Sequence, residues 1–185
     1  NSCGAQRLAC AQLLSVLSDP LSVPALLEAL ELEDEAAAGA ALGLGKIAQA
    51  HPKYQESLIG PLVSRLSADS PSLRQALVEA LSGFESFLLA RRIEPLVQDP
   101  DPGLRLAALQ ILAQSGQPLD ESLLRAALED ESPGVRRAAI EALAGWPAEQ
   151  ALAFLAPFLR NEQPALRAAA AKTLGRLSSV RQLLA

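Results

Sequence analysis

The sequence predicts an all-α protein of the α-solenoid class, a right-handed superhelix of stacked antiparallel helix pairs. The main observation is a repeat of 31 residues, which places prolines in one column and arginines in another. A period of this length is typical of helical units that bury their apolar faces on one another. Alanine and leucine dominate, and aromatic residues make up only 3% of the chain, which also favours helices. The columns are Pro71, Pro102, Pro133 and Pro164, and Arg74, Arg105, Arg136 and Arg167.

The second helix of each repeat is expected to begin at its proline. Ser70, Asp101 and Ser132 stand directly before a proline, where a side-chain oxygen can accept a hydrogen bond from a free backbone N–H. Gln163 has this place in the last repeat and should cap less well. A single solenoid over residues 1–185 is therefore predicted, with second helices near residues 5–17, 36–47, 71–84, 102–115, 133–146 and 164–177.

The first helices are predicted over residues 23–32, 56–67, 85–97, 119–128 and 148–159. The last four each contain two apolar residues one turn apart, which indicates a buried stripe. Prolines inside these helices should bend them, because proline removes a backbone hydrogen bond. These prolines are Pro61, Pro95 and Pro157, and the apolar pairs are Leu62 and Leu66, Ile93 and Val97, Leu124 and Leu128, and Leu155 and Leu159.

The repeat over residues 23–54 departs from the pattern. Ala37 stands in the arginine column, and the following repeat starts six residues late. The extra residues, within 48–54, should form a surface loop or an added turn of helix, and they are either a functional edge or a neutral insertion. His51 lies among them and is expected to be exposed. Three glycines should allow close backbone approach in this second helix: Gly39, Gly43 and Gly45.

Both ends of the chain resemble half-repeats. Residues 4–17 fit a second helix without its first, and residues 179–185 fit a first helix without its second. Because the chain also lacks methionine, we expect a piece of a longer protein. Cys3 and Cys10 lie seven residues apart on one predicted helix, which is beyond disulfide reach. A lipid on Cys3 after signal removal stays open, but a metal site is not expected with one histidine.

The charge pattern limits the kind of partner. A net charge of −5 and a pI near 5.0 argue against broad affinity for nucleic acid or anionic membranes. No apolar stretch is long enough to insert into a membrane, and we expect a cytoplasmic chain. Acids cluster around the first helix-to-helix turn, either as a solvated turn or as an acidic docking patch. They are Glu28, Glu31, Glu33, Asp34 and Glu35.

The helix pairs, the acid-rich turn and the segment P-x-[LV]-R-x-A at residues 102–107, 133–138 and 164–169 resemble HEAT repeats. The chain is most similar to the short bacterial type called phycobilisome-lyase HEAT-like. The resemblance covers nearly the whole chain and is strongest over residues 66–177. It also implies that the repeated arginines meet acids of the turns, drawn from Asp69, Asp99 and Asp130, as a ladder. The alternative is an arginine row that binds phosphates.

In a stack of this kind the second helices line the concave surface. Their outward columns are mostly small or neutral with mixed charge, which suits a peptide or protein better than a polyanion. A solvated face without a partner is the alternative. Trp146 is either an exposed binding anchor or a core residue, and its apolar column favours the core. The candidate partner-binding residues are Gln75, Glu79, Leu106, Gln110, Arg137, Glu141 and Lys172.

We expect a non-catalytic scaffold that binds a partner protein or peptide on its concave face. The sequence shows no nucleophile and base pair, glycine-rich phosphate loop or metal constellation, so no catalytic residue or cofactor is expected. One alternative is a HEAT-like enzyme or enzyme-associated domain, similar to DNA glycosylases or bilin lyases. Another is a regulatory or spacer domain of a larger enzyme or membrane protein, which acts through intramolecular contact with neighbouring domains.

Overall fold

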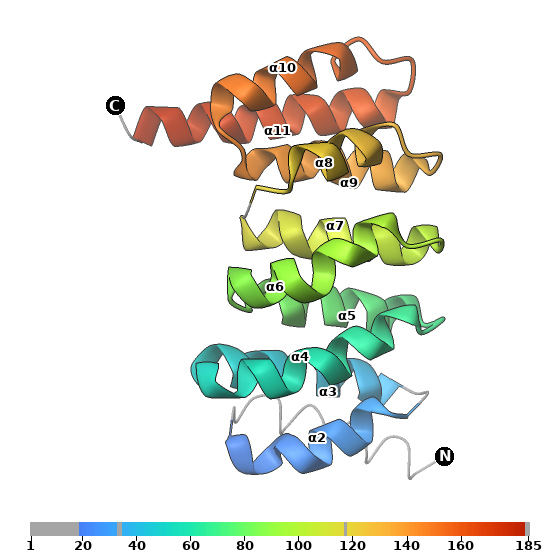
Figure 1. Ribbon diagram of the computed structural model, residues 1–185, viewed down its shortest axis with the longest axis vertical. Helices are drawn as coiled ribbons and strands as arrows, with labels where there is room; N and C mark the ends of the chain where they lie inside the picture. Colours follow the sequence, from blue (N-terminus) through green and yellow to red (C-terminus); the bar gives the residue numbers. More distant parts are fainter. Residues whose placement is uncertain (1–18, 33–34, 117, 184–185) are drawn as a thin grey trace. The chain divides into compact units, whose positions relative to one another are not determined.

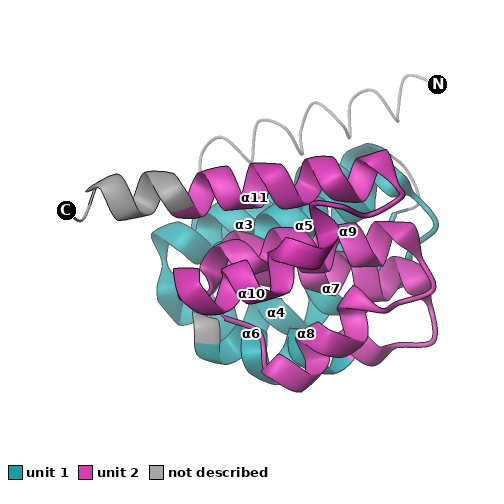
Figure 2. Cartoon of the chain, turned by 90° about the horizontal axis from the view of Figure 1, so that it is seen from above, with its two compact units in different colours: residues 1–95 teal, residues 96–185 magenta. Residues whose placement is uncertain are grey.

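The computed structural model describes residues 19–32, 35–116 and 118–183. Every described element is an α-helix or a 3₁₀-helix, which confirms the predicted all-α solenoid class (Figure 1). The chain divides into two compact units, residues 1–95 and 96–185 (Figure 2), and each is described by itself. The helix predicted near residues 5–17, with Cys3 and Cys10, lies outside the described residues.

Unit 1 contains antiparallel helix pairs packed side by side (Figure 1). Helix α2 packs on α3, α3 on α5, and α4 on both α5 and α6. The elements are η1 (Pro20–Ser22), α2 (Val23–Leu30), α3 (Glu35–Ala50), η2 (Pro52–Tyr54), α4 (Gln55–Ser64), η3 (Arg65–Ser67), α5 (Pro71–Ser82) and α6 (Ser86–Ile93). The 3₁₀-helix η4 (Glu94–Gln98) follows α6.

Unit 2 repeats the same arrangement. Helix α8 pairs with α9 and α10 pairs with α11, while the second helices α7, α9 and α11 pack in that order. The elements are α7 (Pro102–Ser115), α8 (Glu121–Leu128), α9 (Pro133–Ala142), η5 (Leu143–Gly145), α10 (Ala148–Phe158) and α11 (Pro164–Leu183). The second helices of both units therefore begin at the prolines that define the repeat, apart from α3.

Helix capping follows the prediction at two of three positions. The side chains of Ser70 and Asp101 accept from backbone N–H groups of α5 and α7, at 3.3 and 2.9 Å. Ser132 stands at the N-cap of α9, but its side chain makes no capping hydrogen bond, so that prediction was wrong. The nearby carboxylate of Asp130 instead accepts from the Ser132 N–H at 2.9 Å. Asp99 and Asn161 accept in the same way from the N–H two residues on.

The buried columns of the first helices are largely as predicted. The apolar pairs of α4, α6 with η4, and α8 are buried, and so is Leu155 of α10. Leu159 contradicts the pattern, because it lies just beyond the end of α10 with 36% of its surface exposed. Pro61 and Pro157 lie inside α4 and α10. Pro95 does not lie inside an α-helix, since α6 ends at Ile93 and η4 carries the proline.

The separate helix predicted over residues 179–185 is wrong. Helix α11 continues from Pro164 to Leu183 without a break. Residues 176–183 contain neither proline nor glycine, so nothing in the sequence ends the helix before residue 179. Ser178 and Ser179 are weak helix formers, but they do not end a helix.

The insertion in unit 1 is an added turn of helix. Helix α3 runs on to Ala50, and η2 follows directly after His51. His51 is half-buried rather than exposed, and its ring meets the edge of Tyr54 with centroids 6.4 Å apart. The packing of this aromatic pair removes part of the histidine from solvent.

Gln55 fixes the insertion to the rest of unit 1. Its side chain is buried, with 4% of the residue exposed, and its amide nitrogen donates to the carbonyl of Ala48 at 3.1 Å. The amide oxygen accepts from the backbone N–H of Glu85 at 2.8 Å. One side chain thus joins α3 to the residue that precedes α6, and both of its buried polar ends are satisfied.

Close backbone approach was predicted for three glycines of α3, and it is clearest at Gly45. A Cβ placed on Gly45 would lie 2.7 Å from both the Cα and the Cβ of Ala80 on α5. Such a distance is much shorter than a van der Waals contact, so the two helix backbones pack at a separation that excludes any side chain at position 45. This contact holds the two second helices of unit 1 together.

Gly45→Ala should therefore lower the free energy of unfolding by about 1–3 kcal/mol, because overpacking forces α3 and α5 apart. Gly60→Ala in α4 is the matched control, since no atom lies within 4 Å of a Cβ at that position. It should be neutral or stabilise the chain slightly through helix propensity. Urea denaturation monitored by circular dichroism measures both variants, and equal destabilisation of the two would contradict the close-packing argument.

Candidate partner-binding surface on the second helices

The repeated arginines position the second helices. Each one donates from its guanidinium to backbone carbonyls at the end of the preceding first helix and its turn. These carbonyls lack partners within the helix, and a cation there also suits the helix dipole. The contacts join Arg74 to Leu66 and Ala68, Arg105 to Asp99 and Pro100, Arg136 to Asp130 and Glu131, and Arg167 to Asn161 and Glu162.

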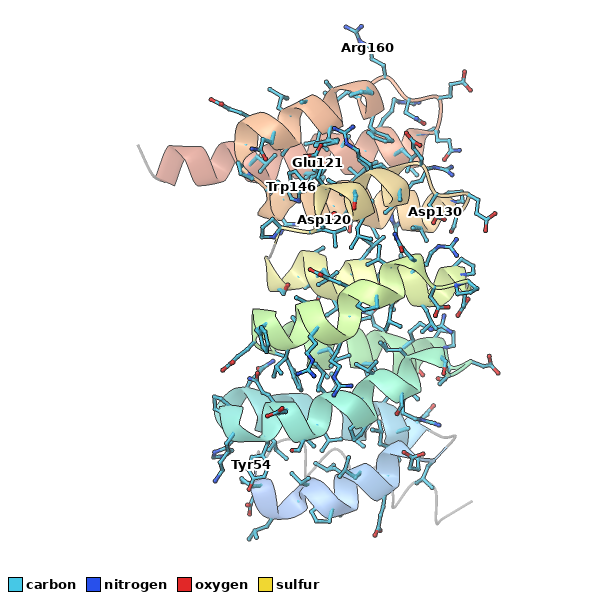
Figure 3. All side chains as sticks on the ribbon, in the orientation of Figure 1. Tyr54, Asp120, Glu121, Asp130, Trp146 and Arg160 are labelled. Atoms are coloured by element: carbon cyan, nitrogen blue, oxygen red, sulfur yellow. The ribbon has the colours of Figure 1, made fainter. Side chains whose placement is uncertain are left out.

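The predicted acid ladder is present at one step of the described chain. Arg105 of α7 holds the carboxylate of Asp130 with two parallel bonds, Nε to Oδ2 at 2.8 Å and Nη2 to Oδ1 at 2.9 Å. Figure 3 shows Asp130 at the turn before α9. Arg136 instead meets the side-chain amide of Gln163 at 3.3 Å. The ladder prediction was too general, because Asn161 has the place of Asp130 in the next turn and Arg136 forms no ion pair among the described residues.

The Arg105–Asp130 pair is electrostatically strong because it is largely removed from water. Only 10% and 12% of the two side chains are exposed. The hydrogen bond from Arg105 is the main reason that the pKa of Asp130 is lowered, and it outweighs the opposing effect of burial. The same bond raises the pKa of Arg105. The pair joins α7 to the turn that starts α9, and so it fixes the spacing of the surface formed by these helices.

Unit 2 brings five of the seven predicted residues onto adjacent second helices. Leu106 and Gln110 are half-buried on α7, Glu141 is half-buried on α9, and Arg137 and Lys172 are exposed on α9 and α11. We call these five the unit 2 surface. Because α9 packs between α7 and α11, the five residues come from three neighbouring helices (Figure 1).

Leu106 supplies the apolar part of the unit 2 surface. Its Cδ2 atom lies 3.7 Å from the position that a Cβ on Gly134 would have. The side chain of Leu106 therefore leans from α7 toward the first turn of α9. The small residue at position 134 leaves Leu106 half-exposed instead of covering it. An apolar contact of this kind can anchor a partner.

The charges of the unit 2 surface are free to meet a partner. Within the described residues, no ion pair within 4 Å involves Arg137, Glu141 or Lys172. Arg137 and Glu141 are one helical turn apart, yet they do not pair with each other. The surface thus offers two cations and one anion around an apolar side chain.

The other two predicted residues lie in unit 1. Gln75 and Glu79 are exposed on α5, one turn apart, and α5 packs against α3. Helix α3 presents Lys46 and Gln49 to solvent. The structure therefore places the predicted residues in two groups, one in each unit, and only the group in unit 2 joins three helices.

Trp146 is a core residue, as its column predicted. Only 8% of Trp146, which is labelled in Figure 3, is exposed. Its ring and that of Phe154 meet edge to face with centroids 5.6 Å apart. The guanidinium of Arg125 covers the Phe154 ring at 4.8 Å and pairs with Glu121 at 2.6 Å. This stack joins α8 to α10 and to the end of η5, so Trp146 packs the first helices instead of anchoring a partner.

A cavity of about 340 Å³ in unit 1 was missed from the sequence. It lies between the end of α2, η3 and the start of α5. The signal that could have found it is the pair of alanines, Ala37 and Ala68, which stand in the arginine and aspartate columns of the repeat. The lining residues are Leu32, Arg65, Ser67, Ala68, Asp69, Ser70 and Leu73.

The part of the chain that the structure describes contains neither a group of metal ligands nor a membrane-spanning helix. Within it, no three His, Cys, Asp or Glu side chains gather in a way that could hold a metal ion. None of the described helices is long and apolar enough to cross a membrane.

Comparison with known proteins supports the fold. A family model for HEAT repeats matches residues 121–184. An archaeal HEAT-like repeats protein from Thermococcus onnurineus NA1 is 18% identical with a TM-score of 0.60, over 94% of this chain and 80% of that one. A designed armadillo repeat protein in complex with the peptide (KR)4 is 17% identical with a TM-score of 0.50, over 93% and 97%. No curated protein matches the sequence.

These likenesses and the packed helix pairs define a class, the HEAT and armadillo type of α-solenoid. Within that class, residues 121–184 match HEAT repeats in particular.

Asp130→Asn should lower the free energy of unfolding by about 2–4 kcal/mol at neutral pH, because it removes the largely buried carboxylate that pairs with Arg105 and leaves only the exposed Glu131 as its ion-pair partner. The pKa of Asp130 is lowered on folding, so its contribution is present above the unfolded pKa and is lost as the pH falls through the folded value. The wild-type chain should therefore lose more stability below about pH 4 than Asp130→Asn.

Urea denaturation at a series of pH values from about 2 to about 7, which span the ordinary pKa of an aspartate, measures this difference. The control is the double variant R105M/D130L, which removes both charges and should be less destabilised than Asp130→Asn at neutral pH. Identical pH profiles of the wild type and Asp130→Asn would contradict the role of this pair.

Proposed function

We propose that the chain is a non-catalytic scaffold that binds a partner protein or peptide on the unit 2 surface. The observation that supports this most is the combination of half-exposed Leu106 with the unpaired charges of Arg137 and Lys172 on adjacent helices. An apolar contact surrounded by polar groups is the usual composition of a protein interface. The second-helix residues of unit 1, Gln75 and Glu79, are candidates for further contacts.

The charge of the surface favours a polypeptide over a polyanion. Glu141 lies one helical turn after Arg137, Lys172 has the place of Glu141 in the next repeat, and the whole chain carries a net charge of −5. A nucleic acid would need a continuous row of cations on this face. Mixed charges instead suit a peptide whose side chains alternate in sign, or a protein surface with the complementary pattern.

The fold class supports a peptide partner by precedent. The designed armadillo repeat protein of similar fold was solved with a bound peptide, (KR)4. We also propose that the repeats are of the short phycobilisome-lyase HEAT-like type, on the evidence of the segment P-x-[LV]-R-x-A at three second helices. A neighbouring domain of the same polypeptide is a partner that fits the proposal equally well.

The groups with a shifted pKa have partners within the fold. Among the described residues, a pKa clearly departs from its ordinary value at Arg105, Asp120 and Asp130. Arg105 and Asp130 pair with each other, and Asp120 has its pKa lowered mainly by the hydroxyl of Ser122 at the start of α8, which donates to its carboxylate. All three shifts therefore have a role in holding the fold.

The experiment is a selection of peptides from a random display library on the intact chain, followed by affinity measurement by calorimetry. The variant L106A/R137A should weaken the selected peptides at least about tenfold, because it removes the apolar anchor and a central charge. The control is L152A/R160A, which removes an exposed leucine and an exposed arginine associated with α10 and should leave the affinity unchanged.

Both double variants change solvent-accessible side chains and should keep the helicity and melting temperature of the wild type, which circular dichroism checks. Full retention of affinity by L106A/R137A would contradict the proposed surface. An electrophoretic shift at moderate salt tests the other class of partner, and tight, salt-sensitive DNA binding would contradict a polypeptide partner.

A further inference from the structure

Unit 1 lacks one arginine–aspartate pair of the repeat. In unit 2 the pair consists of Arg105 and Asp130, which stands six residues before the next column arginine, Arg136. At the corresponding step of unit 1 the arginine position holds Ala37, and the position six residues before Arg74 holds Ala68. Both members of the pair are therefore replaced by alanine.

The cavity of about 340 Å³ lies where this pair would be. Arg105 is surrounded by the turn before its own helix and by the turn of the following repeat. Three residues that line the cavity have the same places in the repeat as three residues that contact Arg105. Leu32, Ala68 and Asp69 correspond to Pro100, Asp130 and Glu131.

Arg65 lines the cavity, but it does not belong to the arginine column of the repeat. The corresponding residues of the following repeats are Leu96, Ala127 and Phe158, so the arginine is particular to unit 1. Its Nη2 atom donates to the carbonyl of Leu32 at 3.3 Å. In the register of the repeat, the Leu32 carbonyl corresponds to the Pro100 carbonyl, to which Arg105 donates. Arg65 thus replaces one contact of the missing column arginine.

The guanidinium of Arg65 lacks the carboxylate that such a place normally supplies. Its Nε atom is buried, and among the described residues this atom has no hydrogen-bond partner and Arg65 forms no ion pair. Arg105 uses the same two atoms, Nε and Nη2, to hold Asp130. A buried donor without an acceptor is unfavourable, and a carboxylate is the acceptor that a guanidinium edge fits best.

We propose that this cavity binds the carboxylate side chain of an aspartate or glutamate from a polypeptide partner. The carboxylate lies against the guanidinium of Arg65, which lines the cavity, at the place that Asp130 has in unit 2. The site is separate from the unit 2 surface and does not depend on the proposed function. Its volume is within the range of small-ligand sites, which allows a single side chain to enter with its neighbouring atoms.

The surroundings limit the ligand to one carboxylate. Asp69 lines the cavity and is exposed, and Glu31 and Glu35 are exposed near the end of α2 and the start of α3. Their repulsion acts through water and is screened by salt, whereas the guanidinium of Arg65 lines the cavity and meets the carboxylate directly. A polyanion would meet all of these acids at once, so the site favours a single acidic side chain over nucleic acid or a phosphate-rich ligand.

The first experiment supplies the carboxylate from within the chain. In A68D the new side chain should pair with Arg65 and raise the melting temperature above that of A68N, which carries the same shape without the charge. The gain of A68D over A68N should vanish when both are made in an R65M background. If the higher melting temperature of A68D persists in the R65M background, or if A68D gives no gain at all, the proposal that Arg65 lacks a carboxylate partner is overturned.

The second experiment detects the ligand at Arg65 directly. The Nε–H resonance of Arg65 in ¹⁵N-arginine-labelled protein is identified by its loss in R65M. It should shift in a saturable way with N-acetylglutamate α-amide in the millimolar range, and not with N-acetylglutamine amide. A68D should weaken this binding at least about tenfold by occupying the site, and A68N should not. No saturable shift, or equal shifts with both compounds, would overturn the proposal.

One further variant tests whether the carboxylate comes from a partner or from the chain itself. Glu33 and Asp34 lie outside the described residues, so E33Q/D34N is titrated beside the wild type. An unchanged Arg65 Nε–H resonance before titration, with the same or tighter glutamate binding, is the expected result. A resonance already shifted by E33Q/D34N in the absence of ligand would show that the chain supplies its own carboxylate, and would overturn the proposal.

Discussion

The hydrogen bonds from the repeated arginines to the carbonyls of the preceding turn are the constraint on which the rest of the structure depends. The end of a helix leaves carbonyls without partners within the helix, and the arginine side chain supplies donors for them. One guanidinium, placed four residues into the second helix, reaches both carbonyls five and six residues earlier at Arg105, Arg136 and Arg167. The angle between the two helices of a repeat is thereby fixed by local contacts.

The acid of the neighbouring turn is a second, optional contact. Arg105 has it in Asp130, whereas Arg136 has only the amide of Gln163. Both arginines keep their carbonyl contacts, so the turn tolerates the loss of the ion pair. This agrees with the physics of such pairs, because part of the attraction between two largely buried charges is offset by the water that both lose. The carbonyl contacts therefore hold each repeat, and the acid links particular neighbours.

Much of the fold could be predicted because its signals are local. Helix starts follow the proline column, and the buried columns follow helical periodicity, so the second helices from residue 71 onward begin where expected. Two predictions about single side chains were wrong. Ser132 stands at the N-cap of α9 without a side-chain capping bond, because a serine before a proline permits this bond but does not enforce it. Leu159 repeats a core position but lies beyond the end of α10, where the following chain leaves it partly exposed.

The candidate surface was predictable to the extent that exposure on a helix follows from spacing alone. Arg137, Glu141 and Lys172 are solvent-accessible for that reason. The cavity was not predictable in this way, because it depends on Arg65, which comes from another column and reaches the turn of a different repeat. A sequence pattern can show that the pair at Ala37 and Ala68 is missing, but not which side chain enters the space that is left.

The divergent repeat of unit 1 shows how a stack remains stable without the arginine contact. Where Ala37 replaces the arginine, α3 is built from small buried residues and approaches α5 so closely that Gly45 has no room for a side chain. Gln55 then joins the extended end of α3 to the residue before α6 with two hydrogen bonds. Close backbone packing and a neutral amide thus take over the linking role of the charged groups. Because α3 and α5 are held by these contacts, the step between them does not need the arginine–aspartate pair, and the cavity beside η3 and the start of α5 remains without loss of the packing in unit 1.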